Sequence, residues 1–167
     1  MKNLLVLMGL LFTSVCVHAN DGQNTQKIAV IKKLYDEHLK EKSKFNIHSL
    51  FSKDFNQATE HNAKAEKAAD GIACLEYDYI IQGQDYDAKE IKRTLKTQVM
   101  PNGRVEVTFN NFGSKNTVHY VFSCNAQTCL IDDIIEPEEL QGKPKSSFKQ
   151  GLRQCLRKNF PKVSPPK

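Results

Sequence analysis

The chain begins with an apolar stretch that decides the compartment in which it folds, and therefore which covalent links can hold the fold. A short basic start precedes an apolar run from Leu4 to Val17, which is too short to serve as a stable bilayer anchor. The run predicts a cleavable signal peptide of residues 1–19. Small or tolerated residues precede the expected cut after Ala19, so we expect a periplasmic protein.

Cys16 raises the alternative of a lipid anchor, but Val15 stands where lipid attachment needs a small residue. We therefore expect about 148 mature residues without a membrane anchor, as one domain over 20–160 and a disordered tail over 161–167. Removing Lys2 from the 24 Lys and Arg leaves a charge near +4 against 19 Asp and Glu. This mild charge does not indicate a nucleic-acid partner.

Removal of the leader also leaves an even set of cysteines: Cys74, Cys124, Cys129 and Cys155. In an oxidising compartment such a set predicts two disulfides, for which three connectivities exist. Cys124 and Cys129 lie at the facing ends of two predicted strands, so we expect them to pair, which leaves Cys74 for Cys155. A zinc site is disfavoured because no two cysteines have Cys-x-x-Cys spacing, and we expect no metal or other cofactor.

Helical periodicity marks both ends of the expected domain. Apolar residues recur every three or four positions from Thr25 to Lys42, which predicts an amphipathic helix. A second helix is expected from a cap at Ser49 to Asp70, with residues 59–64 as a place where it could break. Ser146 or Ser147 would cap a last helix, whose apolar face carries Phe148, Leu152, Cys155 and Leu156.

Between these helices the hydrophobic period changes to two. Residues 74–81 predict a short extended segment before a polar turn. Four strands are then expected at 91–100, 105–109, 118–122 and 129–135, with turns at 101–103 and 113–116. Short connections between consecutive strands predict an antiparallel meander. The fold class is α+β: helices packed on one face of a curved antiparallel sheet, with a further helix after it.

Four short segments carry a family resemblance: Leu34-Tyr35, the stretch 78–86 that ends in Gln84-Asp85-Tyr86, the hairpin segment 103–107, and Ile131-Asp132-Asp133-Ile134. Together they resemble a poorly characterised family of bacterial periplasmic proteins with the cone-shaped fold of nuclear transport factor two, a cystatin-like fold. The resemblance implies a curved sheet around helices, with a pocket at the open end of the cone. Enzymes, ligand binders and interaction modules all use that shape.

The densest polar and aromatic cluster of the sequence follows residue 76. It would suit a pocket or a protein-binding patch, but Asp and Gln beside Gly83 also suit a turn, in which they bond to nearby backbone. We favour the turn and keep the cluster as the first binding candidate. The cluster consists of Tyr77, Asp78, Tyr79, Gln84, Asp85, Tyr86 and Asp87, and the binding candidates within it are Tyr77, Asp78, Gln84, Asp85 and Tyr86.

A second candidate is the acidic end of the last strand. Strand alternation places Asp132 and Asp133 on opposite faces, and the glycine and ligand spacing of a calcium loop are absent. We therefore favour a solvated strand end over a metal site. Asp132, Asp133 and Glu136 remain binding candidates.

His119 is a third candidate, since it lies on the sheet face opposite Val118 and Tyr120 and would suit a general base in a cone pocket. No nucleophile or acid partner stands at a defined spacing from it, and no catalytic motif occurs in the sequence. We therefore assign no catalytic residue.

These observations favour a non-enzymatic periplasmic binding protein with a protein partner in the envelope. Some small exported proteins of this type resemble immunity proteins, which neutralise toxins delivered to the periplasm by neighbouring bacteria, so the most specific expectation is an inhibitor of such a toxin. The alternative is a small-molecule binder or enzyme that uses the cone pocket, with Asp78, Asp85 and His119 as its polar groups. The sequence does not decide whether the protein also forms a homodimer.

Overall fold

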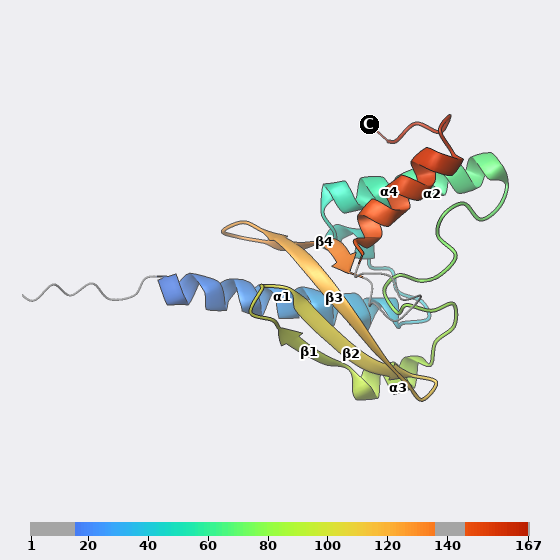
Figure 1. Cartoon of the computed structure of the whole chain (residues 1–167). Helices are drawn as coiled ribbons and strands as arrows, with labels where there is room; N and C mark the ends of the chain where they lie inside the picture. Colours follow the sequence, from blue (N-terminus) through green and yellow to red (C-terminus); the bar gives the residue numbers. More distant parts are fainter. Residues whose placement is uncertain (1–15, 136–145, 167) are drawn as a thin grey trace, which may run out of the picture.

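The computed structural model describes residues 16–135 and 146–166. Within these ranges the elements follow one another as α1 (Cys16–His38), the 3-10 helix η1 (Ile47–Leu50), α2 (Lys53–Ala69), α3 (Ala88–Thr94), β1 (Lys96–Val99), β2 (Val105–Asn111), β3 (Ser114–Cys124), β4 (Cys129–Ile135) and α4 (Phe148–Asn159). The predicted α+β class, with a helix after the sheet, is confirmed (Figure 1).

The sheet is the predicted antiparallel meander, with strand order β1-β2-β3-β4. The predicted turn at 101–103 joins β1 to β2, and Gly103 has a φ of 78°, which favours glycine. The next turn is shorter than predicted. β2 ends at Asn111 and pairs directly with Ser114 of β3, so two residues form this connection in place of residues 113–116.

Helix α1 lies along one face of the sheet and closes it (Figure 1). Its Ile31 and Leu34 have no exposed surface, and its Tyr35 ring lies 5.8 Å from that of Phe109 on β2. The sheet side of this core consists of the alternating residues Val105, Val107, Phe109, Val118 and Tyr120. Each fully buried large apolar side chain contributes about 1.5–3 kcal/mol, so the packing of α1 on the sheet stabilises the fold substantially.

Helices α2 and α4 form a second layer beyond β4 (Figure 1). Phe55 of α2 stacks on Phe148 of α4, with ring centroids 5.6 Å apart. The outer edge of β4 also has hydrogen-bond partners. Ser52 N donates to Ile131 O at 2.7 Å, and Ser147 forms an isolated antiparallel β-bridge with Ile135. This edge is therefore not open for pairing with a further strand.

The first half of the predicted strand 91–100 is wrong, since residues 88–94 form α3. The Asp87 carboxylate accepts hydrogen bonds from Lys89 N and Glu90 N and caps the helix. Ile91 is its one buried residue, and only from Lys96 does the chain join the sheet. The alternation at 95, 97 and 99 was real, but it began later than the predicted strand.

Several helix ends also differ from the predicted ones. Ser49 caps nothing: Ser52 caps α2 through a bond from Phe55 N, and the helix runs unbroken through 59–64. No strand forms over 74–81. Helix α1 starts at Cys16 and ends at His38, so the expected cut after Ala19 falls inside it, while leader residues 1–15 lie outside the described ranges.

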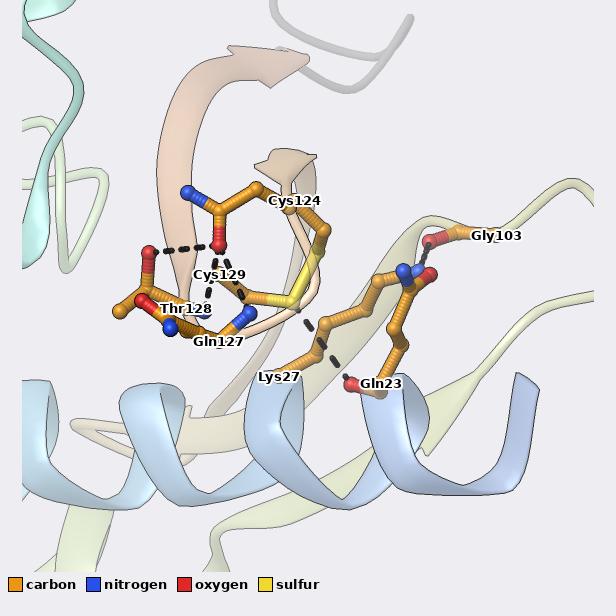
Figure 2. Close-up of a disulfide and its surroundings, with 8 residues drawn as sticks. Gln23, Lys27, Gly103, Cys124, Gln127, Thr128 and Cys129 are labelled. Atoms are coloured by element: carbon orange, nitrogen blue, oxygen red, sulfur yellow. Dashed lines mark hydrogen bonds between the residues drawn. A yellow bond between two sulfur atoms is a disulfide. The ribbon is translucent and has the colours of Figure 1, made fainter. Parts of the chain in front are cut away.

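Both predicted disulfides are present, with Cα–Cα distances of 6.0 Å for Cys74–Cys155 and 4.1 Å for Cys124–Cys129. The second closes the β3–β4 turn above α1 (Figure 2). On the same helix, Lys27 Nζ donates to Gly103 O at 2.9 Å. Lys27 thus joins the middle of α1 to the β1–β2 hairpin, and the β3–β4 turn lies beside the same helix. None of the helices within the described residues is long and apolar enough to cross a membrane.

Candidate functional site

The loop between α2 and α3 carries the first predicted cluster, and it is tied down along its length. Asp78 and Gly83 exchange two backbone hydrogen bonds, of 2.9 and 3.3 Å. Between them, Ile80 and Ile81 are buried in the core and anchor the loop. The exposed tip, Gln84 to Asp87, therefore projects from a fixed base.

Asp78 is held by a residue that the sequence analysis did not select. His38 Nε2, in the last turn of α1, lies 2.6 Å from Asp78 Oδ2, and Ile80 N donates to Oδ1 at 2.8 Å. The centroid of the His38 ring lies 6.0 Å from that of the Tyr86 ring. The bonded pair His38–Asp78 therefore lies beneath the exposed side chain of Tyr86.

Beneath the loop, two tyrosines share one acceptor. The hydroxyl of Tyr35 donates to Ile80 O at 2.9 Å and lies 3.0 Å from the hydroxyl of Tyr120, which itself lies 3.3 Å from Ile80 O. Burial raises the pKa of both phenols well above the ordinary value, and the charge of Asp78 adds to the effect. Burial likewise raises the pKa of Tyr79 to about 12. These groups therefore stay protonated, and the interior under the loop is closed by its own side chains.

The other residues of the cluster are more exposed. Gln84 Nε2 donates to Glu76 O at 3.3 Å, Asp85 is exposed, and Tyr86 is 39% exposed. Tyr77 is half-buried beside α4 and lies away from this tip, in a hollow with Leu75 and Phe148.

The tip is joined to the β2–β3 turn by a residue that the sequence analysis missed. Asn111 Nδ2 donates to Asp85 O at 3.0 Å, and Asn111 Oδ1 accepts from Asp87 N at 2.9 Å. These bonds lie on either side of Tyr86 in the sequence. Phe112, which follows Asn111, is 65% exposed. The signal was present as Asn-Phe-Gly between two alternating strands. We call residues 84–87 with 111–114 the loop–hairpin surface.

His119 lies on the open face of the sheet, as alternation predicted. Its Nε2 contacts Glu106 Oε2 of the neighbouring strand at 3.0 Å. The buried Tyr120 points to the other face, toward α1. His119 and Asp78 are therefore not brought into one pocket, and each is paired with a different partner.

The predictions that Asp132 and Asp133 lie on opposite faces of the sheet and that they form a solvated strand end are wrong. The register shifts so that Val121 pairs with Asp133 and Phe122 with Ile131, which makes Asp132 the extra residue of a β-bulge. Both carboxylates consequently reach the amino end of α4. Asp133 is only 9% exposed.

The bonds of these two acids hold helices to the sheet. Asp132 accepts from Ser52 Oγ at 2.6 Å and from Lys149 Nζ at 3.0 Å. Asp133 accepts from Ser147 Oγ and from Lys149 N. The third acidic candidate, Glu136, lies outside the described residues.

Three of the surface hollows formed by residues 16–135 and 146–166 bear on these features, and Asp78, Asp85 and His119 line none of the three. One of about 230 Å³ is lined by Cys74, Leu75, Tyr77, Phe148, Gly151 and Leu152. A second, of about 560 Å³, lies between Asn24 and residues 98–103. A third, of about 320 Å³, is lined by His61, Arg157 and residues of the chain end from Phe160 to Pro165.

The chain end, which the sequence predicts to be disordered, contacts the fold through Val163, whose carbonyl lies 2.7 Å from His61 Nε2.

No group of three or more His, Cys, Asp or Glu side chains within residues 16–135 and 146–166 is placed to hold a metal ion.

Comparison with known proteins adds to the fold rather than to the chemistry. No protein-family model matches the chain, and no curated protein matches it in sequence. A solved structure of a protein of unknown function from Bacteroides thetaiotaomicron VPI-5482 is similar, with a TM-score of 0.51 and 20% identity. The similarity covers 74% of this chain and 100% of that one. At this identity the two share a fold, and nothing about function follows.

Proposed function

We propose that this protein is a non-enzymatic binding protein of the bacterial envelope that contacts another protein through its loop–hairpin surface. In its most specific form it is an immunity protein, which would neutralise a secreted toxin that acts on the envelope. The observation that carries the proposal is an exposed loop tip fixed by hydrogen bonds on both sides of Tyr86.

A fixed tip favours binding because little conformational entropy remains to be lost on association. Tyrosine is also among the residues that contribute most to protein interfaces, since its ring buries a large area with few rotatable bonds. The Tyr86 side chain stands over the His38–Asp78 pair, so a partner would meet a defined shape.

The envelope is the proposed location for two reasons. The leader expected at residues 1–19 would export the chain. The two disulfides suit an oxidising compartment and would not persist in a reducing cytosol.

The alternative of a small-molecule binder or enzyme in a cone pocket has less support. Tyr35, Phe109 and Tyr120 fill the space between α1 and the sheet, where such a pocket would lie. Asp78 and His119 are each engaged with another residue, on opposite sides of the sheet.

Affinity purification of the tagged, exported protein from the envelope of its native host tests the proposal. We expect one protein to copurify with the wild type and to be reduced at least about tenfold by Tyr86→Ala, the loss typical of an interface hot spot. Gln127→Ala, at the exposed β3–β4 turn, is the matched control and should retain the partner.

Absence of a protein partner would contradict the proposal, as would equal recovery with Tyr86→Ala. Thermal stabilisation by envelope metabolites would then favour the alternative, since a ligand at 100 times its dissociation constant adds about 2.7 kcal/mol.

A further inference from the structure

The backbone conformation at position 112 does not favour phenylalanine. It is the first of the two residues between β2 and β3, and its φ is 49°, followed by 78° at Gly113. Two positive φ values in a two-residue hairpin connection define a type I′ turn, whose first position favours Asn, Asp or Gly. A bulky side chain there strains the backbone.

The Phe112 ring gains little from the fold in return. It is 65% exposed, whereas every large side chain on the core face of β2 is buried. The backbone strain thus lowers stability, and the exposed ring contributes little burial to offset it. Asn at this position would relieve the strain, since an Asn-Gly pair is the preferred type I′ sequence. The residue is therefore better explained by contact with something outside the chain.

The turn that carries Phe112 is also held in place. Asn111 is bonded to the backbone of Asp85 and Asp87, and on the other side Gly113 N donates to Glu90 Oε2 at 3.1 Å. Phe112 and Tyr86 consequently stand on one platform built from the loop tip, the start of α3 and the hairpin. Two aromatic side chains on a rigid support have the composition of an interface centre.

The charges of this platform differ from those of the whole chain. The chain has a formal net charge of +5, yet the groups bonded to the turn or flanking Tyr86 are the acids Asp85, Asp87 and Glu90. Lys89 and Lys115 are the bases nearest to Tyr86 and Phe112 along the chain, and Lys92 and Arg93 follow in the last turn of α3. This arrangement disfavours an anionic membrane surface, which attracts basic segments, and fits a protein with basic groups around an apolar pocket.

We propose, building on the function proposed above, that Phe112 is the anchor residue of this protein: a partner protein takes its ring into an apolar pocket rimmed by basic side chains. Tyr86 lies beside that pocket, and the acids of the platform face its rim.

Site-specific photocrosslinking in the full, exported chain tests the inference. Phe112→p-benzoylphenylalanine should give one discrete adduct with a second protein in the native envelope, and the same replacement at Gln127 should give none. Excess unlabelled wild type should compete the adduct away, while the Phe112→Asn protein should compete at least about tenfold less well. Raising the salt concentration should lower the yield, because the rim contacts are electrostatic.

Adducts with a second copy of this chain, with lipid alone, or with nothing would overturn the inference. Equal competition by Phe112→Asn would also overturn it.

Thermal unfolding of Phe112→Asn gives an independent readout. We expect its Tm to rise by about 2–4 °C, because the turn strain is relieved. A lower Tm would mean that Phe112 serves the fold, and would sink the inference.

The two proposals fail in different ways. If the partner is lost with Tyr86→Ala but kept with Phe112→Asn, the binding function stands and the anchor is wrong. If the wild type captures no protein, both fail.

Discussion

Two buried tyrosine side chains close the interior under the 76–87 loop, and their hydroxyl groups have hydrogen-bond partners there. The hydroxyls of Tyr35 and Tyr120 meet at the carbonyl of Ile80, in a place where an unpaired polar group would cost about 1–3 kcal/mol. This arrangement joins α1, β3 and the 76–87 loop at one point. The base of the candidate surface is therefore as rigid as the core beneath it.

Gly151 is a residue whose replacement should stabilise the fold. It lies within α4, and a Cβ built there meets no atom within 4 Å. Glycine in a helix is less favourable than alanine by about 0.5–1 kcal/mol, so we expect Gly151→Ala to raise the Tm by about 2 °C. Thermal unfolding followed by circular dichroism would measure it.

The matched control for this change is Gly103→Ala, because Gly103 has a φ of 78° and should lose stability instead. A fall in Tm for Gly151→Ala would contradict the prediction, and would mean that a methyl group in the hollow lined by Gly151 and Tyr77 disturbs the packing there.

At the scale of elements, α2 and α4 are joined by an ionic cluster as well as by stacked rings. Asp54 of α2 lies 2.6 Å from Arg153 and 2.8 Å from Lys149 of α4. Hydrogen bonds from Arg153 and then Lys149 lower the pKa of Asp54 to about 2. Burial alone would lower the pKa of Lys149, but the bonds to Asp54 and Asp132 outweigh it and raise this pKa.

This cluster predicts a pH dependence whose sign follows from the lowered pKa. A carboxylate with a folded pKa below its unfolded value stabilises the fold above the unfolded pKa, and the contribution is lost as the pH falls from about 4 to 2. Because the Asp54 side chain is half-exposed, we expect less than about 1 kcal/mol. Asp54→Asn should melt below the wild type at pH 6 and together with it near pH 2, as followed by thermal unfolding.

The control for this titration is Asp85→Asn, an exposed carboxylate at the loop tip with no salt bridge to the described residues. Its replacement removes no contact of the ionic cluster between α2 and α4, so it shows how the Tm responds to the loss of a surface carboxylate alone. A gap between wild type and Asp54→Asn that stays constant down to pH 2 would exclude an ionic role for Asp54.

For the whole molecule, the two disulfides differ in what they constrain. Cys74–Cys155 joins residues 81 positions apart and links the candidate loop to α4, whereas Cys124–Cys129 spans only 5 positions. In the chain-entropy model the first contributes about 4.5 kcal/mol and the second about 2 kcal/mol.

Replacing both cysteines of each pair by alanine should therefore have unequal effects. The Cys74→Ala/Cys155→Ala protein should unfold at a clearly lower urea concentration than the Cys124→Ala/Cys129→Ala protein. The reverse order would show that the constraint on α1 beside the β3–β4 turn matters more than the long loop.

Local sequence patterns by themselves determine many of the secondary-structure elements of this protein. The alternation at 105–109, 118–122 and 129–135 predicted three strands, and the turn at 101–103 predicted a hairpin, because side-chain period and turn chemistry act over a few residues. The disulfides followed from the same local information, since two strand ends that face each other bring Cys124 and Cys129 together. The candidate loop was also recognised, from its dense polar and aromatic composition.

The rest was decided by contacts between residues far apart in the chain. His38 meets Asp78 across 40 positions, and Asn111 meets Asp85 across 26, so no local pattern predicts either bond. Helix α3 replaced half of an expected strand, since the Asp87 cap and the burial of Ile91 outweighed alternation. The bulge at Asp132 turned two acids toward α4, because the β3–β4 register shifts by one residue. Local periodicity thus sets the elements, and only their packing determines which polar side chains meet and which surface is left to bind.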